Sequence, residues 1–180
     1  MAEGPISMST PKAGLFELLG KFDNSIGELP PVDSWNPKLS GDMDIVIKSN
    51  GDWIHEGDLI EREKLSRLFS SIIKKEGTDY FLVTPVEKWR IQVEDQPFTI
   101  VLCHTGEAEL SFITNMGEEV ALRNKEQLIM DDDHEAPRLQ IRNNLYARLN
   151  RATYYQVVEQ AKEHGDRYFI ESNGNRFYIS

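Results

Sequence analysis

Four side chains of a predicted hairpin near the carboxyl end have the chemistry to bind an anion. Residues 138–142 and 145–149 alternate apolar and polar residues, and alternate residues of a strand lie on the same face. Guanidinium groups bind phosphate and carboxylate oxygens in paired hydrogen bonds, and a tyrosine ring can stack on a base. The alternation therefore predicts an anion site on one face of the hairpin, formed by Arg138, Arg142, Tyr146 and Arg148.

The distribution of charge bears on this site in two ways. The chain has a net charge of −10, which disfavours binding to nucleic acids and to anionic membranes. Residues 137–180 nevertheless contain seven Lys and Arg against four Asp and Glu, an excess of positive charge that suits a small anion. The alternative is that the hairpin arginines form a solvated face and pair with the acidic first half of the chain.

A second candidate site is the turn that follows a strand expected at residues 80–84. Pro85 turns the chain there, and residues that leave the end of a strand often line a crevice. Thr84 has a hydroxyl group that can bind a ligand, and Glu87 and Lys88 have charged groups that can do the same. The alternative is an ordinary turn in which these charges are simply exposed.

Two tryptophans and a histidine complete the candidates. Trp35 lies in a polar, Pro-rich connector, and its large apolar surface favours insertion into a core or a groove. Trp53 and His55 fall on one face of a short strand, so Trp53 can line a ligand site and His55 can act as a general base. The alternative is a structural role for His55, because no catalytic partner is evident.

Several other groups do not form a known chemical motif. The acidic run at residues 131–135 lacks the ligand spacing of a calcium loop, so a flexible loop is the better interpretation. Cys103 and His104 are adjacent in a predicted strand and point to opposite faces, so His104 cannot easily activate the thiol. There is no phosphate-binding glycine loop, no hydrolase serine motif and no zinc spacing. We therefore expect no metal, no cofactor and no catalytic residue.

The elements that would position these residues repeat along the chain. The order strand, turn, strand, helix, glycine and strand occurs twice, 88 positions apart, with helices expected at about 59–76 and 151–164. Asp58 and Asn150 would cap the helix starts, and Gly77 and Gly165 would follow the helix ends. A repeated unit predicts two similar halves, and a groove between halves is a common ligand site.

The expected fold class is α+β, with two small domains that each contain an antiparallel sheet and one covering helix. We expect a disordered tail at residues 1–11 and an amino-terminal domain at 12–97, which begins with a short helix at 12–22 and the Pro-rich connector. Residues 98–180 form the expected carboxyl-terminal domain. No apolar run approaches the roughly 18 residues of a membrane span, and no secretory signal is evident, so a cytoplasmic location is expected.

Several segments, taken together, resemble one bacterial protein family. They are residues 35–37, 51–57, 62, 68–71, 80–88, 93–98 and 114–117, of which the block from 80 to 98 is the most specific. Over about residues 30–160 the chain resembles the family called domain of unknown function 1285. The resemblance implies two domains with a duplicated core and a carboxyl-terminal domain superficially like pleckstrin-homology-type folds. It also implies a ligand site between the domains, a nucleotide-like ligand and a signalling role, and it supplies no catalytic residues.

These observations favour a non-enzymatic, regulatory protein that binds a small anionic ligand, of which a nucleotide is one candidate, in the groove between its domains. One alternative is an interaction module that binds a peptide or a partner subunit, with Trp35 and the connector as contacts. Another is a hydrolase with an unorthodox site around His55, Glu56 and Glu87.

Overall fold

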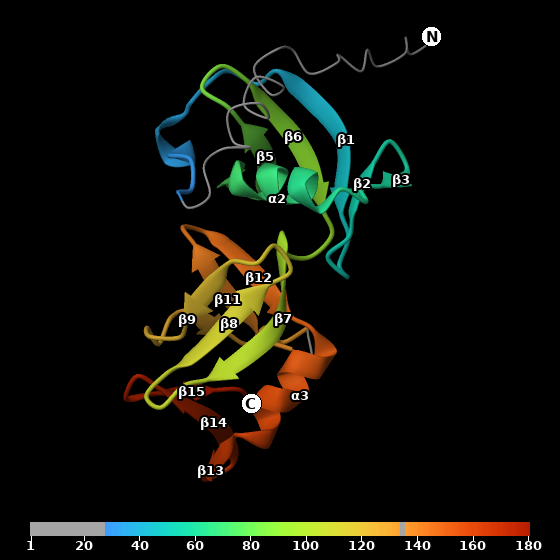
Figure 1. Ribbon diagram of the computed structural model, residues 1–180. Coiled ribbons are helices and arrows are strands. Elements are labelled where there is room, and N and C mark those ends of the chain that lie inside the picture. The colour runs from blue at the N-terminus through green and yellow to red at the C-terminus, as the bar shows by residue number, and fades with distance from the viewer. Residues whose placement is uncertain (1–27, 134–135) are drawn as a thin grey trace. The chain divides into compact units, whose positions relative to one another are not determined.

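The computed structural model describes residues 28–133 and 136–180, which form two compact units (Figure 1). The N-terminal unit runs to Ile47 and continues over Asp52–Val93, and the C-terminal unit combines Lys48–Gly51 with Glu94–Ser180. Mostly β-structure and two α-helices among the described residues confirm the expected two-domain α+β architecture. The tail predicted at 1–11 and the helix predicted at 12–22 lie outside the described residues.

The N-terminal unit is a six-stranded sheet with one α-helix. The strands lie in the order β3-β2-β1-β6-β5-β4, and β1 and β6 are parallel while the other neighbours are antiparallel. The elements are η1 (Val32–Ser34), β1 (Gly41–Ile47), β2 (Trp53–His55), β3 (Asp58–Leu59), α2 (Glu63–Ser71), β4 (Ile73–Glu76), β5 (Asp79–Val83) and β6 (Lys88–Val93).

The core of this unit forms where the helix packs on the sheet. Trp53 on β2 is 2% exposed and stacks on Phe69 of α2, with ring centroids 6.2 Å apart. Ile45, Ile47 and Leu82 are buried on the strands. Burial of these large apolar side chains is the main stabilising contribution to the unit.

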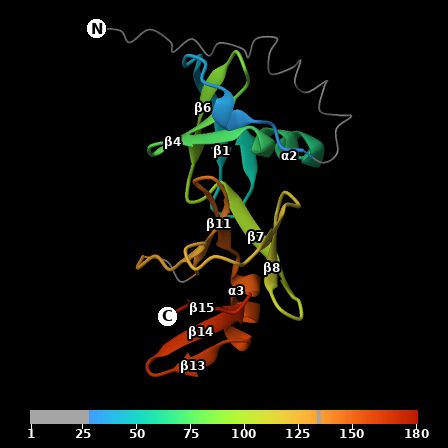
Figure 2. The ribbon, with the colours of Figure 1, turned by 90° about the vertical axis from the view of Figure 1, so that its left-hand side faces the viewer.

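The C-terminal unit contains two sheets and one α-helix. A six-stranded sheet has the order β10-β11-β12-β7-β8-β9, and a three-stranded sheet has the order β13-β14-β15 (Figure 2). The elements are β7 (Phe98–Thr105), β8 (Leu110–Thr114), β9 (Glu119–Ala121), β10 (Leu128–Ile129), β11 (Arg138–Arg142), β12 (Leu145–Leu149), α3 (Arg151–Glu159), β13 (Lys162–His164), β14 (Arg167–Ser172) and β15 (Asn175–Tyr178).

A buried serine joins the two sheets of the C-terminal unit. The Ser172 hydroxyl donates to the Leu122 carbonyl at 2.6 Å and accepts from the Leu110 amide at 2.8 Å. Next to it, the Asn173 amide donates to the Ala108 carbonyl at 2.8 Å. Because buried backbone groups need partners, these bonds fix the β14–β15 hairpin against the end of β8.

Both predicted helices are wrong at their carboxyl ends, because each helix gives way to a strand. Residues of β4 and β13, expected to be helical, pair with β5 and β14. Gly77 and Gly165, with φ of 60° and 63°, therefore lie in hairpin turns instead of following a helix. The predicted Asp58 cap is also wrong, because α2 begins after Arg62, whereas the Asn150 cap is confirmed by a 2.8 Å bond from the Thr153 amide.

The two large sheets are mixed, not antiparallel as expected. The pairs β1–β6 and β12–β7 are parallel, and the strands of each pair are far apart in the sequence, so local alternation does not reveal their direction. Both units contain a hairpin, a helix and a second hairpin in that order. The second hairpin joins the large sheet in one unit and belongs to a separate sheet in the other. The duplicated core and the likeness to pleckstrin-homology-type folds stay predictions.

Candidate functional site

The structure brings Arg138, Tyr146 and Arg148 together on one face of the β11–β12 hairpin. Arg138 lies opposite Arg148 in the register, and its guanidinium lies 4.7 Å from the Tyr146 ring centroid. Arg142 lies at the other end of β11, beyond an irregularity in the pairing, and packs 5.0 Å from the ring centroid of Phe98.

These arginines are engaged by carboxylates of their own unit. Arg148 donates from Nε and Nη2 to the two carboxylate oxygens of Asp95, both at 2.8 Å, and from Nη1 to Asp131 at 2.9 Å. Arg138 Nε donates to the other oxygen of Asp131 at 3.1 Å, and Arg142 forms an ion pair with Glu118. An added anion would therefore have to compete with a carboxylate at each of them.

The Arg148 guanidinium is the most deeply placed of the three. Its side chain is 11% exposed. Burial lowers the pKa of Arg148, but its hydrogen bonds to Asp95 and Asp131 and their charges outweigh this effect and hold the pKa above its ordinary value. The group is permanently charged and held in a fixed geometry, as expected of a structural ion pair.

The turn after β5 holds its polar side chains in local contacts. Thr84 is buried, and its hydroxyl accepts hydrogen bonds from the amides of Val86 and Glu87, at 3.2 and 2.9 Å. Glu87 is 6% exposed. Lys88 pairs with Glu76, and its ammonium lies 4.4 Å from a phenyl ring centroid on β5. The Thr84 hydroxyl thus stabilises the turn by bonding to two of its backbone amides.

The other predicted residues of the N-terminal unit are spread over its surface and core. Trp53 is buried under α2, whereas Trp35 is half-buried and its carbonyl accepts a hydrogen bond from Lys74 at 2.9 Å. His55 is exposed, and its Nε2 lies 3.9 Å from Glu56. Trp35 is connected to Lys88 through Lys74 and Glu76, whereas Trp53 and His55 lie on β2. The ligand site predicted from these residues stays a prediction.

Within residues 28–133 and 136–180, no three His, Cys, Asp or Glu side chains gather as they would around a metal ion.

Burial raises the pKa of the Cys103 thiol to about 11, so this group is protonated at neutral pH. The helices described here are too short or too polar to cross a membrane.

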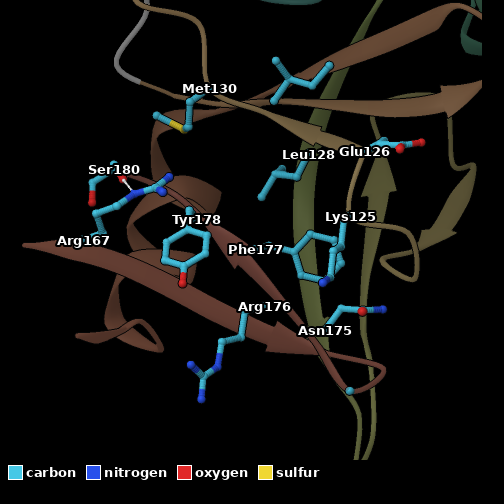
Figure 3. A pocket seen from close by; sticks show the side chains of 12 residues that line it. Lys125, Glu126, Leu128, Met130, Arg167, Asn175, Arg176, Phe177, Tyr178 and Ser180 are labelled. Carbon is cyan, nitrogen blue, oxygen red and sulfur yellow. Dashed lines mark hydrogen bonds between the residues drawn. The ribbon is translucent and has the colours of Figure 1, made fainter. Parts of the chain in front are cut away.

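A pocket of about 820 Å³ opens within the C-terminal unit, between β10 and β15 (Figure 3). We call it the β10–β15 pocket. Its lining residues are Lys125, Glu126, Leu128, Ile129, Met130, Arg167, Gly174, Asn175, Arg176, Phe177, Tyr178 and Ser180. Leu128, Met130 and Phe177 make part of the wall apolar, and the charged residues Lys125, Glu126, Arg167 and Arg176 are exposed at its rim.

The arginines of this pocket lie against aromatic rings. The Arg167 guanidinium is 4.0 Å from the ring centroid of Tyr178, and its Nε donates to the Ser180 carbonyl at 3.3 Å. Arg176 lies 4.7 Å from the Phe169 ring centroid, and it forms an ion pair with Glu171, whose carboxylate is 3.8 Å from Nε. Arg167 has no ion pair to Asp or Glu within the described part of the chain.

Lys125, Arg167 and Arg176 are not among the site residues predicted from the sequence. The excess of positive charge over residues 137–180 indicated Arg167 and Arg176 only as part of a group, and Lys125 lies outside that segment. Their position became visible once the structure placed the β14–β15 hairpin beside the loop that leads into β10.

Two crystal structures resemble this chain along much of its length. A DUF1285 family protein from Silicibacter pomeroyi DSS-3 has 31% sequence identity and a TM-score of 0.77, covering 89% of this chain and 93% of its own. A DUF1285 family protein from Shewanella baltica OS155 has 34% identity and a TM-score of 0.57, covering 65% of this chain and 91% of its own. No curated protein matches the chain.

The family comparison divides the chain in two. Residues 30–96 match the N-terminal domain of the family described as domain of unknown function (DUF1285), and residues 97–179 match its C-terminal domain. The resemblance inferred from the sequence is confirmed, and the chain belongs to the DUF1285 family.

Proposed function

We propose that this protein is a non-enzymatic binding protein that holds a small anionic ligand in the β10–β15 pocket and acts in regulation or signal transduction. The observation that carries the proposal is the charge of the pocket, in which Lys125, Arg167 and Arg176 face a single acidic side chain of the lining, Glu126, while Arg176 also pairs with Glu171. Exposed cations attract anions most where no carboxylate already neutralises them.

Arg167 is the main anchor in this proposal. Its guanidinium keeps free donors because Tyr178 contacts its face and only Nε bonds to the Ser180 carbonyl. A guanidinium offers five N–H donors in a planar fork, which fits the paired oxygens of a phosphate or a carboxylate. The hairpin arginines Arg138 and Arg148 already use this fork on Asp95 and Asp131.

A binding role also agrees with the protonation of Cys103 and with the position of His55, the two side chains considered for catalysis. The Cys103 thiol is protonated at neutral pH, since burial raises its pKa to about 11. His55 is exposed beside Glu56 on β2 of the N-terminal unit, whereas the proposed anchor belongs to the C-terminal unit. The pocket itself is lined by cations and by the rings of Phe177 and Tyr178, which suit the binding of an anion.

The proposal is tested by calorimetric titration of the full chain with ATP, GMP, pyrophosphate and a polyglutamate oligomer. We expect at least one of these anions to bind, and we expect Arg167→Ala to weaken that binding about tenfold or more. Ligand binding to the native state should also raise the midpoint of thermal unfolding, and Arg167→Ala should lose this rise.

Arg123→Ala is the matched control, because it removes one positive charge from the same unit outside the pocket lining. Arg123 is exposed and already forms a forked ion pair with Glu109, at 2.9 and 3.0 Å. It should leave binding nearly unchanged. Equal losses in Arg123→Ala and Arg167→Ala, or no binding of any of the four anions, would show that the pocket is not the site.

A further inference from the structure

We infer that the anionic ligand of the β10–β15 pocket is an acidic peptide in extended conformation, which adds as a new strand to the free edge of β15. This inference rests on the proposed function and names the class of its ligand. It is carried by the backbone of the pocket, in addition to its charges.

The lining of the pocket follows the edges of two strands. Residues 174–178, which are β15 and the glycine before it, line the pocket consecutively, and so do residues 128–130, which are β10 and the methionine after it. Successive side chains of a strand point to opposite faces, so a pocket that contacts them all runs along the edge of the strand. Both β10 and β15 are outermost in their sheets, which leaves one edge of each without a neighbouring strand.

The register shows which backbone groups lie on the free edge of β15. The Ile179 amide donates to the Tyr168 carbonyl at 2.9 Å, so these two residues form a hydrogen-bonded pair. Hydrogen-bonded and non-hydrogen-bonded pairs alternate along an antiparallel hairpin, so the backbones of Phe177 and Asn175 also bond to β14. The N–H and C=O groups of Arg176 and Tyr178 therefore point away from β14. Within the described residues, no backbone group pairs with them.

The same reasoning applies to β10. The Gln140 amide donates to the Gln127 carbonyl at 2.8 Å, and Leu128 lies opposite Leu139 in the next, non-hydrogen-bonded pair. The N–H and C=O of Leu128 thus point away from β11. A row of unpaired strand groups is the template on which extended peptides are added to sheets.

A free strand edge distinguishes a peptide from other anions. Arg176 and Tyr178 offer two carbonyl oxygens there as well as two amide groups. A phosphate or a free carboxylate can use only the donors, and the carbonyl oxygens would repel it. An extended peptide presents N–H and C=O groups alternately, so it uses both kinds.

The side chains around the edge predict the pattern of the peptide. Arg176, Tyr178 and Arg167 lie on one face of the three-stranded sheet, as the pairing of β14 with β15 requires, and Phe177 lies on the other. Leu128 and Met130 provide apolar surface, and Lys125 and Arg167 lie toward opposite ends of the lining residues in Figure 3. An added strand alternates its side chains in the same way, so it should alternate acidic and apolar residues.

The test uses the full chain and a fluorescein-labelled peptide, Glu-Val-Glu-Val-Glu-Val, in a fluorescence anisotropy titration. β15 contains four residues, so six peptide residues at about 3.3 Å each exceed its length. We expect the rearranged peptide Glu-Glu-Glu-Val-Val-Val, with the same charge, to bind about tenfold more weakly. A Lys-Val-Lys-Val-Lys-Val peptide should not bind.

Backbone methylation separates strand addition from attraction of charge alone. Peptides N-methylated on all Glu amides or on all Val amides keep their side chains, and only one of the two sets should lose binding, by about tenfold or more. Loss with methylated Glu amides indicates antiparallel addition to β15, and loss with methylated Val amides indicates parallel addition.

The matching test on the protein compares two substitutions of one residue. Arg176→Ala and Arg176→Pro both remove the positive charge, but only proline also removes the outward N–H of residue 176. Because this N–H does not bond to β14, proline is compatible with the edge strand, and circular dichroism and the unfolding midpoint verify the fold. We expect Arg176→Pro to bind the alternating peptide about tenfold more weakly than Arg176→Ala.

The outcomes are distinguishable from those of the proposed function. If the anions bind in an Arg167-dependent way while the alternating and rearranged peptides bind equally, or if both methylated peptides bind equally, the inference is wrong and the proposed function stands. If no anion and no peptide responds to Arg167→Ala, both are wrong.

Discussion

Removal of the Arg148 guanidinium should destabilise the C-terminal unit by about 3 kcal/mol. Arg148 donates three hydrogen bonds of 2.8–2.9 Å to Asp95 and Asp131, and a fourth of 2.9 Å to the Ala136 carbonyl. The exposed fractions of the three charged side chains are 11%, 16% and 25%. Breaking a buried ion pair by removing one partner costs about 3–5 kcal/mol. Because the carboxylates keep some contact with water, we place Arg148→Ala near the lower limit.

Arg148→Lys should cost less, about 1–2 kcal/mol. Arg148 donates two hydrogen bonds to Asp95 and one to Asp131. Lysine keeps the positive charge, but its single ammonium group cannot make these three bonds in the same geometry. The free energy of unfolding would be measured by urea denaturation of the full chain, followed by circular dichroism. The order wild type, Arg148→Lys, Arg148→Ala separates the contribution of charge from that of geometry.

Arg123→Ala is the control for burial. Arg123 also donates a fork to one carboxylate, that of Glu109, but the two side chains are 60% and 35% exposed. Exposed ion pairs contribute little to stability, so the change should be much smaller than for Arg148→Ala. If Arg148→Ala destabilised the chain no more than Arg123→Ala does, the reasoning from burial would be refuted.

Three further predictions concern other parts of the described chain. Gly51→Ala should cost about 1–3 kcal/mol in urea denaturation, because Gly51 has a φ of 94° and an added Cβ would lie 2.9 Å from the Asn115 amide nitrogen. Iodoacetamide should modify Cys103 at least about tenfold more slowly in the native chain than in the unfolded chain, as followed by mass spectrometry, because burial raises its pKa from 9.0 to about 11 and the greater nucleophilicity of the thiolate offsets only part of this effect. Glu76→Gln should reduce the loss of stability between about pH 7 and about pH 3, measured as urea midpoints. The hydrogen bond from Lys88 lowers the pKa of Glu76 below its ordinary 4.5, so its contribution is present above that value and is lost as the pH falls through the folded-state pKa.

Each of these predictions has an outcome that contradicts it. Gly57 has a similar φ of 86° but no atom within 4 Å of an added Cβ, so Gly57→Ala should cost less than Gly51→Ala, and equal costs would exclude the close contact as a cause. Modification of native Cys103 at the rate of the unfolded chain would contradict its burial. An unchanged acid sensitivity in Glu76→Gln would show that the Lys88 pair contributes nothing to it.

Local elements could be predicted from the sequence where short-range chemistry decides them. Asn143 adopts positive φ in the turn of the hairpin that the alternation of residues 138–142 and 145–149 predicted. Asn150 caps α3 through the Thr153 amide, as its residue type predicted. Each of these features depends on residues within three or four positions of one another.

The helix ends could not be predicted in this way. Ile72 and Ile73 extend the apolar stripe of α2, yet Ile73 begins β4 and pairs with Leu82. A short segment with apolar residues fits a helix and a strand almost equally well, and the available pairing partner decides between them. The same competition ended α3 before β13.

The surroundings of the hairpin arginines could not be predicted, for a related reason. Alternation correctly gathered Arg138, Tyr146 and Arg148 on one face, but their surroundings depend on Asp95 and Asp131, which lie 53 and 17 positions from Arg148. Carboxylates that are distant in the sequence decide whether an arginine is a free cation or part of a structural ion pair. The sequence does not show which carboxylates lie next to which arginine in the fold.

The sequence by itself determined the family, the two-domain α+β class, the hairpins and the positive charge of the carboxyl-terminal end. Only the tertiary structure decided that β10 and β15 are edge strands, and that Lys125, Arg167 and Arg176 surround one pocket. The physical reason is that a strand has the same local pattern whether or not it has a neighbour on each side. Its unpaired backbone groups are set by the order of strands in the whole sheet.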